Sequence, residues 1–358
     1  MHAPIARSLR TCAYGALLAA LSPNLACDKG GEDKPDSKTA EAKSAEAKSA
    51  EAKTAEAKSA EATKPKAAET KAAEAKAATP GSPCPKGARL IPGGKFFMGS
   101  DSEAPILGRA RPAHQVEVDA VCLDIHEITV AKYKTCVGAG DCKPAFRETW
   151  WPQGKLDEAT WKHDRLVHTP MCNDGQPDRL NHPINCITWA QAAAYCTHKG
   201  GRLPTEAEWE FAARGSDGRV YPWGDEPPDP ERANACDQRC KKWRDDNDLP
   251  DYDMMFDADD GYAGTSPVGS YPKGRTQGGL EDMVGNVYEW TADRFYQYTG
   301  DFQKNPKGPD EGDSRVIRGG AFNSFRAEFA DPAFRYSMDE SAHTHGIGFR
   351  CAFEPKGT

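Results

Sequence analysis

Several features that would identify common protein classes are scarce or absent in this chain. Long apolar runs with helical spacing are scarce, which predicts an irregular fold with few helices and much loop. The net charge is −8 and no basic stripe occurs, which argues against nucleic acid as a partner. No cysteine lies between Cys240 and Cys351, so that stretch offers no thiolate to a metal or a substrate.

The N-terminus has the pattern of an export signal, which we place at residues 1–27. Its apolar core, residues 13–21, follows a basic start and is too short to span a bilayer as a mature helix. A small residue before Cys27 predicts a lipid on that cysteine; simple secretion is the alternative, since Asn24 stands where lipoprotein signals usually carry an aliphatic residue. We expect a lipid-anchored protein of a bacterial cell envelope, in the periplasm or on the outer surface.

Residues 28–83 form a linker rich in alanine, glutamate and lysine, which repeats the unit Ala-Glu-Ala-Lys-Ser/Thr over residues 39–62. Successive units land about 140° apart around an α-helix, so no face collects apolar side chains and a coiled coil is not expected. The segment has almost nothing large to bury, so it cannot offset its ordering entropy. We expect a partly helical tether that holds one domain away from a membrane; a linker of no defined reach is the alternative.

Residues 84–358 form a single block that is long enough for one large core. Helices are predicted to begin at Thr129, Thr188 and Thr205, because the last two open capping boxes and glycines follow each helix. Short strands are predicted over residues 89–98, 115–124 and 316–318. The predicted fold class is therefore α+β, as an irregular, loop-rich single domain.

An ordered series of motifs crosses this domain. The motifs are Ile91-Pro92-Gly93-Gly94-Lys95-Phe96-Phe97-Met98-Gly99-Ser100, Arg202-Leu203-Pro204-Thr205-Glu206-Ala207-Glu208-Trp209-Glu210, Tyr221-Pro222-Trp223-Gly224, Met283-Val284-Gly285-Asn286-Val287-Tyr288-Glu289-Trp290, Arg318-Gly319-Gly320 and Gly348-Phe349-Arg350-Cys351. In this order they resemble the sulfatase-modifying-factor, or formylglycine-generating-enzyme, family over nearly all of residues 84–353. The resemblance implies a fold related to C-type lectins and an oxidase that matures sulfatases.

Ten cysteines follow Cys27, and an even number in an exported chain favours disulfides over zinc. The resemblance implies one pair, Cys196 with Cys351. Cys136 and Cys142 bracket a flexible loop, while two further pairs are local proposals and the last two cysteines remain for each other. The five expected pairs are Cys84–Cys122, Cys136–Cys142, Cys172–Cys186, Cys196–Cys351 and Cys236–Cys240.

Residues 257–262 concentrate carboxylates beside a glycine, and calcium takes six to eight oxygen ligands. Composition alone favours a solvated acidic loop, whereas the family resemblance implies two structural calcium ions. The implied ligands are Asn234, Ala235, Asp260 and Tyr262 for one ion, and Asp282, Gly285, Val287 and Glu289 for the other. Such ions would anchor chain that lacks regular secondary structure.

The reactive cysteine pair of this family is missing. In the family, two thiolates after the Arg-Gly-Gly motif bind copper(I), and one engages the substrate cysteine. Here the corresponding positions are Ser324 and Phe329, and neither a hydroxyl nor a phenyl group suits copper(I). The neighbouring serine, histidine and active-site tryptophan of the family are replaced by Ala321, Phe325 and Tyr288. Formylglycine generation is therefore not expected.

Histidines offer a second candidate metal site. His343 and His345, with Asp339 and Glu340 nearby, supply the residue types of a two-histidine-one-carboxylate iron site. A polar surface loop is the preferred interpretation of this stretch. Two further histidines, His114 and His182, are interpreted as structural hydrogen bonders.

Four tryptophans lie outside the shared motifs, on predicted insertions: Trp150, Trp151, Trp161 and Trp243. If exposed, they would suit a glycan or peptide ligand; if buried, they would close loops over a core.

The leading hypothesis is a non-catalytic, calcium-stabilised binding or accessory module with an unknown protein, peptide or glycan ligand. The alternative is an oxidoreductase of this family that uses copper or iron, and a third idea is a scaffold that presents a partner sulfatase.

Overall fold

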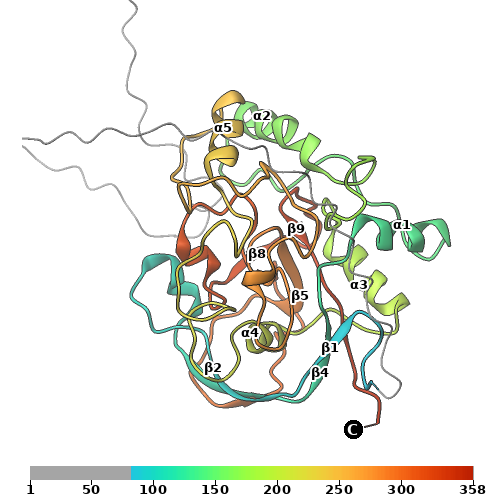
Figure 1. Cartoon of the computed structure of the whole chain (residues 1–358), viewed down its shortest axis with the longest axis vertical. Coiled ribbons are helices and arrows are strands. Elements are labelled where there is room, and N and C mark those ends of the chain that lie inside the picture. The colour runs from blue at the N-terminus through green and yellow to red at the C-terminus, as the bar shows by residue number, and fades with distance from the viewer. Residues whose placement is uncertain (1–81, 358) are drawn as a thin grey trace, which may run out of the picture. The chain divides into compact units, whose positions relative to one another are not determined.

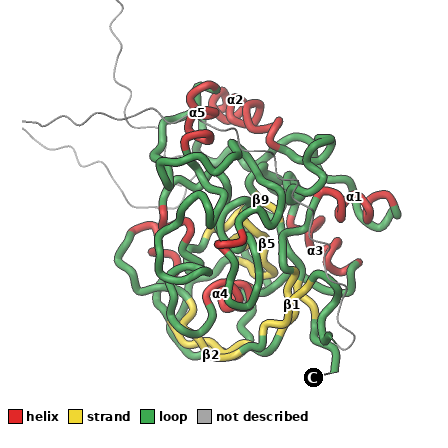
Figure 2. Tube along the Cα trace, viewed as in Figure 1, coloured by secondary structure: helices red, strands yellow, loops and turns green. Residues whose placement is uncertain are grey.

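The computed structural model describes residues 82–357, so the predicted export signal, its Cys27 and the linker lie outside the described residues. The helices are α1 Val130–Gly138, α2 Glu158–His168, α3 Trp189–His198, α4 Glu206–Arg214 and α5 Gln238–Asp246. The strands are β1 Ala88–Ile91, β2 Gly94–Met98, β3 His114–Val118, β4 Val121–Asp124, β5 Tyr288–Arg294, β6 Gln303–Lys304, β7 Arg315–Arg318, β8 Tyr336–Met338, β9 Ile347–Gly348 and β10 Ala352–Phe353. Most of the rest of residues 82–357 is loop (Figure 2). Within residues 82–357, no helix combines the length and the apolar character that crossing a membrane requires.

Three small sheets carry the strands, in the orders β1-β4-β10, β2-β3-β6 and β8-β7-β5-β9. The two strands predicted over residues 89–98 and 115–124 are each divided in two. The first break lies at Gly93, whose φ is +73° and where a Cβ atom would lie 2.5 Å from the carbonyl oxygen of Val118. Only glycine accepts both that backbone conformation and that close approach, so the strand has to turn there.

The helices that begin at Thr129, Thr188 and Thr205 agree with the sequence prediction. Each threonine hydroxyl accepts a backbone N–H of the first turn, and the structure contains complete capping boxes at Thr188 and Thr205. Gly215, with φ +68°, ends α4. These are local signals, which is why the sequence predicts them without knowledge of the tertiary fold.

Helix α4 lies in the interior and packs against β2, β3, β5 and β7. Its two buried carboxylates, Glu206 and Glu210, pair with two buried arginines. Arg335 donates from Nε and Nη2 to the two oxygens of Glu206, at 2.6 Å and 2.7 Å. Arg318 forms an ion pair with Glu210 and lies 2.9 Å from Glu206. The loop that follows β7 is therefore fixed to α4 at both of its ends.

Helices α2 and α5 lie side by side at one end of the domain (Figure 1). The rings of His168 and Trp243 meet edge to face between them, with centroids 5.4 Å apart. The sequence prediction missed both helices. Asp157 and Asp237 cap their N-termini, but neither helix carries the apolar periodicity on which the prediction depended.

Candidate functional site

The segment between Arg318 and Arg335 contains the positions that the resemblance aligns with the reactive thiols. It begins with a tight turn at Gly319 and Gly320, whose φ angles are +97° and +75°. A Cβ atom on Gly320 would lie 2.8 Å from the carbonyl oxygen of Phe329 and 3.1 Å from Oγ of Ser324. Glycine at this position therefore brings the two aligned positions into one compact turn.

Ser324 is 4% exposed, and its surroundings give it no chemical activation. Its Oγ accepts the backbone N–H of Ala321 at 2.9 Å, and its carbonyl accepts the N–H of Cys236 at 2.9 Å. No histidine or carboxylate among the described residues hydrogen-bonds to the hydroxyl, so it has no general base. Burial also raises the pKa of the neighbouring Tyr288, which keeps that phenol protonated.

Phe329 is 2% exposed and belongs to an apolar cluster. Its ring meets Phe325 and Phe334 edge to face, with centroids 5.2 Å and 5.0 Å away, and Leu107 packs in the same cluster. We call Leu107, Phe325, Phe329 and Phe334 the Phe329 cluster. The second thiol position is thus part of a packed aromatic core that offers no ligand to a metal.

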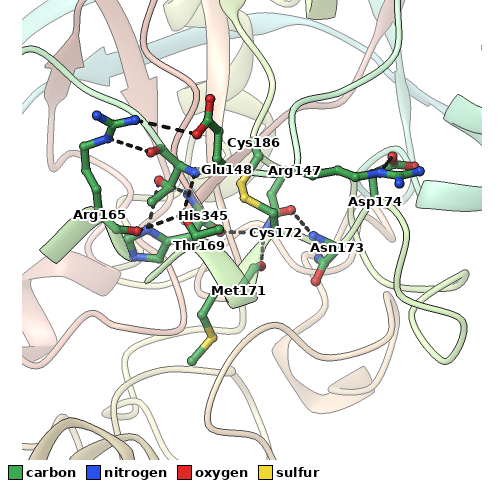
Figure 3. Close-up of a disulfide and its surroundings, with 12 residues drawn as sticks. Arg147, Glu148, Arg165, Thr169, Met171, Cys172, Asn173, Asp174, Cys186 and His345 are labelled. Carbon is green, nitrogen blue, oxygen red and sulfur yellow. Dashed lines mark hydrogen bonds and ion pairs between the residues drawn. A yellow bond between two sulfur atoms is a disulfide. The ribbon is translucent and has the colours of Figure 1, made fainter. Parts of the chain in front are cut away.

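All ten described cysteines are oxidised. The disulfides are Cys84–Cys122, Cys136–Cys142, Cys172–Cys186, Cys196–Cys351 and Cys236–Cys240, the same pairs that we expected from the sequence. The surroundings of Cys172–Cys186 include Arg165, Thr169 and His345 (Figure 3). Residues 82–357 therefore contain no free thiol that could replace the missing pair.

The interpretation of His343 and His345 as part of a polar surface loop is wrong, because the two side chains are only 9% and 4% exposed. His343 stacks on Phe146 at 3.8 Å and on Trp150 at 5.8 Å, between ring centroids. His345 stacks on His168 at 4.2 Å. The rings that bury both histidines precede them by about 180 to 200 positions, so the local sequence does not predict these contacts.

The structure does not bring these histidines together with a carboxylate as an iron site. Within the described part of the chain, three potential metal ligands converge only at Asp237, Asp259 and Asp260. The two histidines that were predicted to be structural make such hydrogen bonds. The Nδ1 atom of His114 lies 3.1 Å from the carbonyl oxygen of Pro112, and that of His182 lies 3.0 Å from Oγ1 of Thr265.

The first predicted calcium position shares Asp260 with this acidic group. Asp260 accepts the backbone N–H groups of Ala235 and Tyr262, while its own N–H donates to Asp237 at 2.6 Å. Burial, together with the charge of Asp237, raises the pKa of Asp260 to about 7. The Oδ1 atom of Asn234 is buried and has no hydrogen-bond partner. Oxygen atoms that are short of partners, beside carboxylates that repel each other, fit a hard divalent cation.

The second predicted position lies next to the first, since the backbone N–H of Asn286 donates to the carbonyl oxygen of Asn234 at 2.9 Å. Burial raises the pKa of Asp282 to about 6. Glu289 is bound at both oxygens by Arg350, at 2.7 Å each, and also accepts from Trp209. A calcium ion here would share Glu289 with that arginine.

Glu127 is a residue of this region that the sequence prediction missed. It is fully buried, and its Oε1 atom has no hydrogen-bond partner. Burial and the charges of Asp282 and Glu289 raise the pKa of Glu127 well above its usual range. Its neighbours in the sequence, His126 and Ile128, give no signal that it would be buried. Its free oxygen adds a further donor suited to a cation.

Comparison with known proteins identifies the scaffold. A family model described as the sulfatase-modifying factor enzyme 1-like domain matches residues 73–355. The chain belongs to this family. The membership agrees with the predicted fold, a mixed α/β single domain of the formylglycine-generating-enzyme type.

Relatives within the sulfatase-modifying factor family differ in the activity that their names state. The chain is 32% identical over 288 residues to the formylglycine-generating enzyme of Mus musculus, and the match covers 73% of each protein. It is also 32% identical over 292 residues to the inactive C-alpha-formylglycine-generating enzyme 2 of Mus musculus, covering 73% of this chain and 84% of that one. Membership of the family therefore does not decide whether this chain is an enzyme.

The solved structure of PvdO from Pseudomonas aeruginosa has the same fold. It matches with a TM-score of 0.57 and 24% identity, covering 78% of this chain and 100% of that chain. At this level of identity the likeness extends to the fold alone.

The four tryptophans outside the shared family motifs have mixed surroundings. Trp151 is buried, and its carbonyl oxygen accepts the indole N–H of Trp161 at 2.9 Å. Trp150 is half-buried against His343. Trp243 on α5 is half-buried as well and lines a cleft. The first three close loops over the domain, whereas Trp243 remains available to a ligand.

Proposed function

We propose that this member of the sulfatase-modifying factor family is a non-catalytic binding or accessory module rather than an oxidase. The observation that carries the proposal is the state of the aligned thiol positions. Ser324 has no base beside it, Phe329 is packed among aromatic rings, and the ten described cysteines are all in disulfides. Copper(I) would find no soft ligand in this segment. The existence of a relative named as inactive supports the same conclusion by analogy.

Calcium is proposed to be structural. Asn234 and Asp260, with the carbonyl oxygens of Ala235 and Tyr262, would hold one ion. The buried Asn234 oxygen without a partner supports this choice. Asp282 and Glu289, with the carbonyl oxygens of Gly285 and Val287, would hold the second ion, and the buried Glu127 oxygen without a partner supports a cation there. The ions would neutralise buried carboxylates and hold in place loops that make few β-sheet hydrogen bonds.

The module is proposed to act in a bacterial cell envelope, attached by a lipid on Cys27 and held off the membrane by the linker. Ten cysteines paired in five disulfides support an oxidising compartment.

A peptide-oxidation assay tests the absence of catalysis. The chain, purified oxidised with calcium, is incubated with copper(I) and a peptide that contains the sulfatase-type sequence Cys-X-Pro-X-Arg. Mass spectrometry follows the conversion of the peptide cysteine to formylglycine. An active formylglycine-generating enzyme serves as the positive control. We expect no conversion by this chain, and conversion would overturn the proposal.

The Ser324→Cys/Phe329→Cys double variant asks whether the scaffold lacks only its thiols. Because Phe329 is buried, its replacement leaves a cavity, so folding of the variant is checked by its melting temperature before the assay. Metal analysis of the natural chain gives an independent readout. Stoichiometric copper or iron in the purified protein would favour an oxidoreductase, whereas we expect calcium alone.

A further inference from the structure

A cleft lies between α5, the end of α2 and two loops of the domain. It has a volume of about 490 Å³, within the range of small-ligand sites, and Trp243, Arg179, His182, Tyr262, Asp178 and Asn247 are among the residues that line it. We call it the Trp243 cleft. None of its lining residues belongs to the Phe329 cluster, so it is separate from the position of the family thiols.

Three side chains of this cleft keep unused hydrogen-bonding groups. The indole N–H of Trp243 has no partner among the described residues, and the ring is half-buried. Arg179 donates from Nη1 to Oδ1 of Asn173 at 2.9 Å, and its other guanidinium nitrogens make no hydrogen bond within residues 82–357. His182 is only 8% exposed and uses Nδ1 on Thr265, which leaves Nε2 without a partner.

Thr265 links His182 to Asn173. Oγ1 of Thr265 accepts from the side-chain amide of Asn173 at 2.9 Å and lies 3.0 Å from Nδ1 of His182 and 3.2 Å from the amide oxygen of Asn173. In either tautomer the Nε2 atom can bind a ligand hydroxyl, as a donor when protonated and as an acceptor when not. Burial lowers the pKa of His182 to about 4, so the ring is neutral at physiological pH.

The charge of the cleft is positive at Arg179. The other lining arginine, Arg239, is neutralised by two hydrogen bonds to Asp259, at 2.8 Å and 2.7 Å. No ion pair occupies Arg179 in the described structure, whereas the exposed Asp178 offers a hydrogen-bond acceptor at the rim. Unused donors around one unpaired guanidinium select a ligand that carries an anionic oxygen group.

We propose that the Trp243 cleft binds a saccharide that bears a carboxylate. The indole ring of Trp243 would stack against the apolar face of a sugar ring. Arg179 would bind the carboxylate, and His182 and Asp178 would bind ring hydroxyls. This proposal names the ligand class of the binding module and therefore rests on the proposed function.

A peptide fits this cleft less well. Its lining comes from helices and loops, and no strand edge borders it to pair with an extended peptide backbone. The mixture of one half-buried aromatic ring and several separate polar groups is the usual composition of a small-ligand site.

The test is a binding experiment on the full-length chain. An array presents saccharides that carry a uronic or sialic acid, each beside its uncharged counterpart, together with peptides that end in a free carboxylate. We expect at least one acidic saccharide to bind about tenfold more tightly than its counterpart, a difference of about 1.4 kcal/mol. Binding of no acidic saccharide, equal binding of both members of a pair, or preference for a peptide would each overturn the proposal.

Variants separate recognition from folding. Trp243→Ala should lower the affinity about tenfold or more, and Trp243→Phe, which keeps a ring but loses the N–H, should lie between it and the natural chain. Arg179→Gln should abolish the preference for the acidic member of each pair, a readout that mere damage to the fold would not produce. Phe302→Ala is the matched control, because Phe302 is 53% exposed and does not line the cleft.

Unchanged acid preference in Arg179→Gln, or unchanged affinity in Trp243→Ala, would contradict the proposal. The peptide-oxidation assay fails or succeeds independently. Conversion of the cysteine peptide would overturn the non-catalytic part of the proposed function. Failure of every acidic saccharide on the array to bind would overturn only the proposed ligand of the Trp243 cleft.

Discussion

Arg335 binds Glu206 at two points inside the domain, from Nε to Oε1 at 2.6 Å and from Nη2 to Oε2 at 2.7 Å. Both side chains are almost completely buried, and Arg318 lies 2.9 Å from the same carboxylate. Glu206 is thus the counter-charge of Arg335 and shares Arg318 with Glu210. The pair joins α4 to the far end of the loop that contains Ser324 and Phe329, so it positions that loop as well as stabilising the fold.

Replacing Glu206 by glutamine should destabilise the domain strongly. The amide keeps the shape but leaves the buried Arg335 without its counter-charge and Arg318 with Glu210 alone, a loss of about 3–5 kcal/mol. Urea unfolding followed by fluorescence measures the change in unfolding free energy. The control is Lys242→Ala, which removes an exposed ion pair on α5 and should change the stability little. Equal stabilities of the two variants would contradict this account of the buried pair.

The stability of the domain should depend on pH through Asp293. Its carboxylate accepts the N–H groups of Glu206 and Gly308, at 2.7 Å and 2.6 Å, and burial, with the charge of Glu206, raises the pKa of Asp293 to about 7. In the unfolded chain the group loses its proton near its ordinary pKa, about 4. Between these values the folded state holds more protons, so its stability falls as the pH rises from about 4 to 7.

Denaturant unfolding at about pH 5 and pH 8, in saturating calcium, checks this dependence. The Asp293→Asn variant should lose part of the fall in stability between the two conditions. Part of it should remain, because burial also raises the pKa of Asp124 to about 6, with the same sign. A pH slope that is identical in the variant and the natural chain would show that Asp293 does not titrate as argued.

The sequence predicted the features that local chemistry controls. Thr188 and Thr205 open capping boxes that involve only their own helices, so the start of each helix follows from a few neighbouring residues. The two helices that were missed have strong caps too, but α2 buries no side chain completely and α5 is mostly charged. Their positions depend on contacts with residues distant in the sequence, such as that of His168 with Trp243, which periodicity along the chain does not report.

Parts of the candidate site could not be predicted from the sequence, because they depend on contacts between residues that are far apart in the chain. Burial of His343 depends on Phe146 and Trp150, which belong to a distant loop. The Trp243 cleft joins α5 to Arg179 and His182, two residues that precede it by about sixty positions. Trp243 could be singled out as an unusual side chain, but its neighbours could not. The ordered family motifs, by contrast, predicted the family and its fold correctly.

Truncating Phe329 should measure how far the aligned thiol position has become part of the core. Phe329→Ala should cost about 3–5 kcal/mol, since the ring contacts Phe325 and Phe334 and the cavity cannot close completely. Phe329→Leu should cost less, because it retains most of the apolar volume. Thermal and urea unfolding give both values, with Phe302→Ala as the exposed control. A cost for Phe329→Ala no larger than that of the control would mean that the Phe329 cluster is loosely packed, and would weaken the argument against a thiol site there.

Calcium should stabilise the domain through Asp260. Without the ion, Asp237 and Asp260 repel each other, and the buried Oδ1 of Asn234 has no partner. Binding to the folded state alone adds about 2.7 kcal/mol when the free ion is at about 100 times its dissociation constant. We therefore expect a chelator to lower the melting temperature by several degrees and added calcium, but not magnesium, to restore it, because magnesium requires a tighter octahedral site.

Asp260→Asn separates this site from the remaining carboxylates. The amide keeps one oxygen but removes the charge, so the variant should melt at nearly the same temperature with and without a chelator if the first position dominates the response. Asp246→Asn, an exposed change on α5, should keep the full response to calcium. Loss of the response in Glu127→Gln, with Asp260→Asn unaffected, would instead assign the stabilising ion to the second position, beside Asp282 and Glu289. Identical melting curves of the natural chain with calcium and with chelator would exclude a structural calcium at either position.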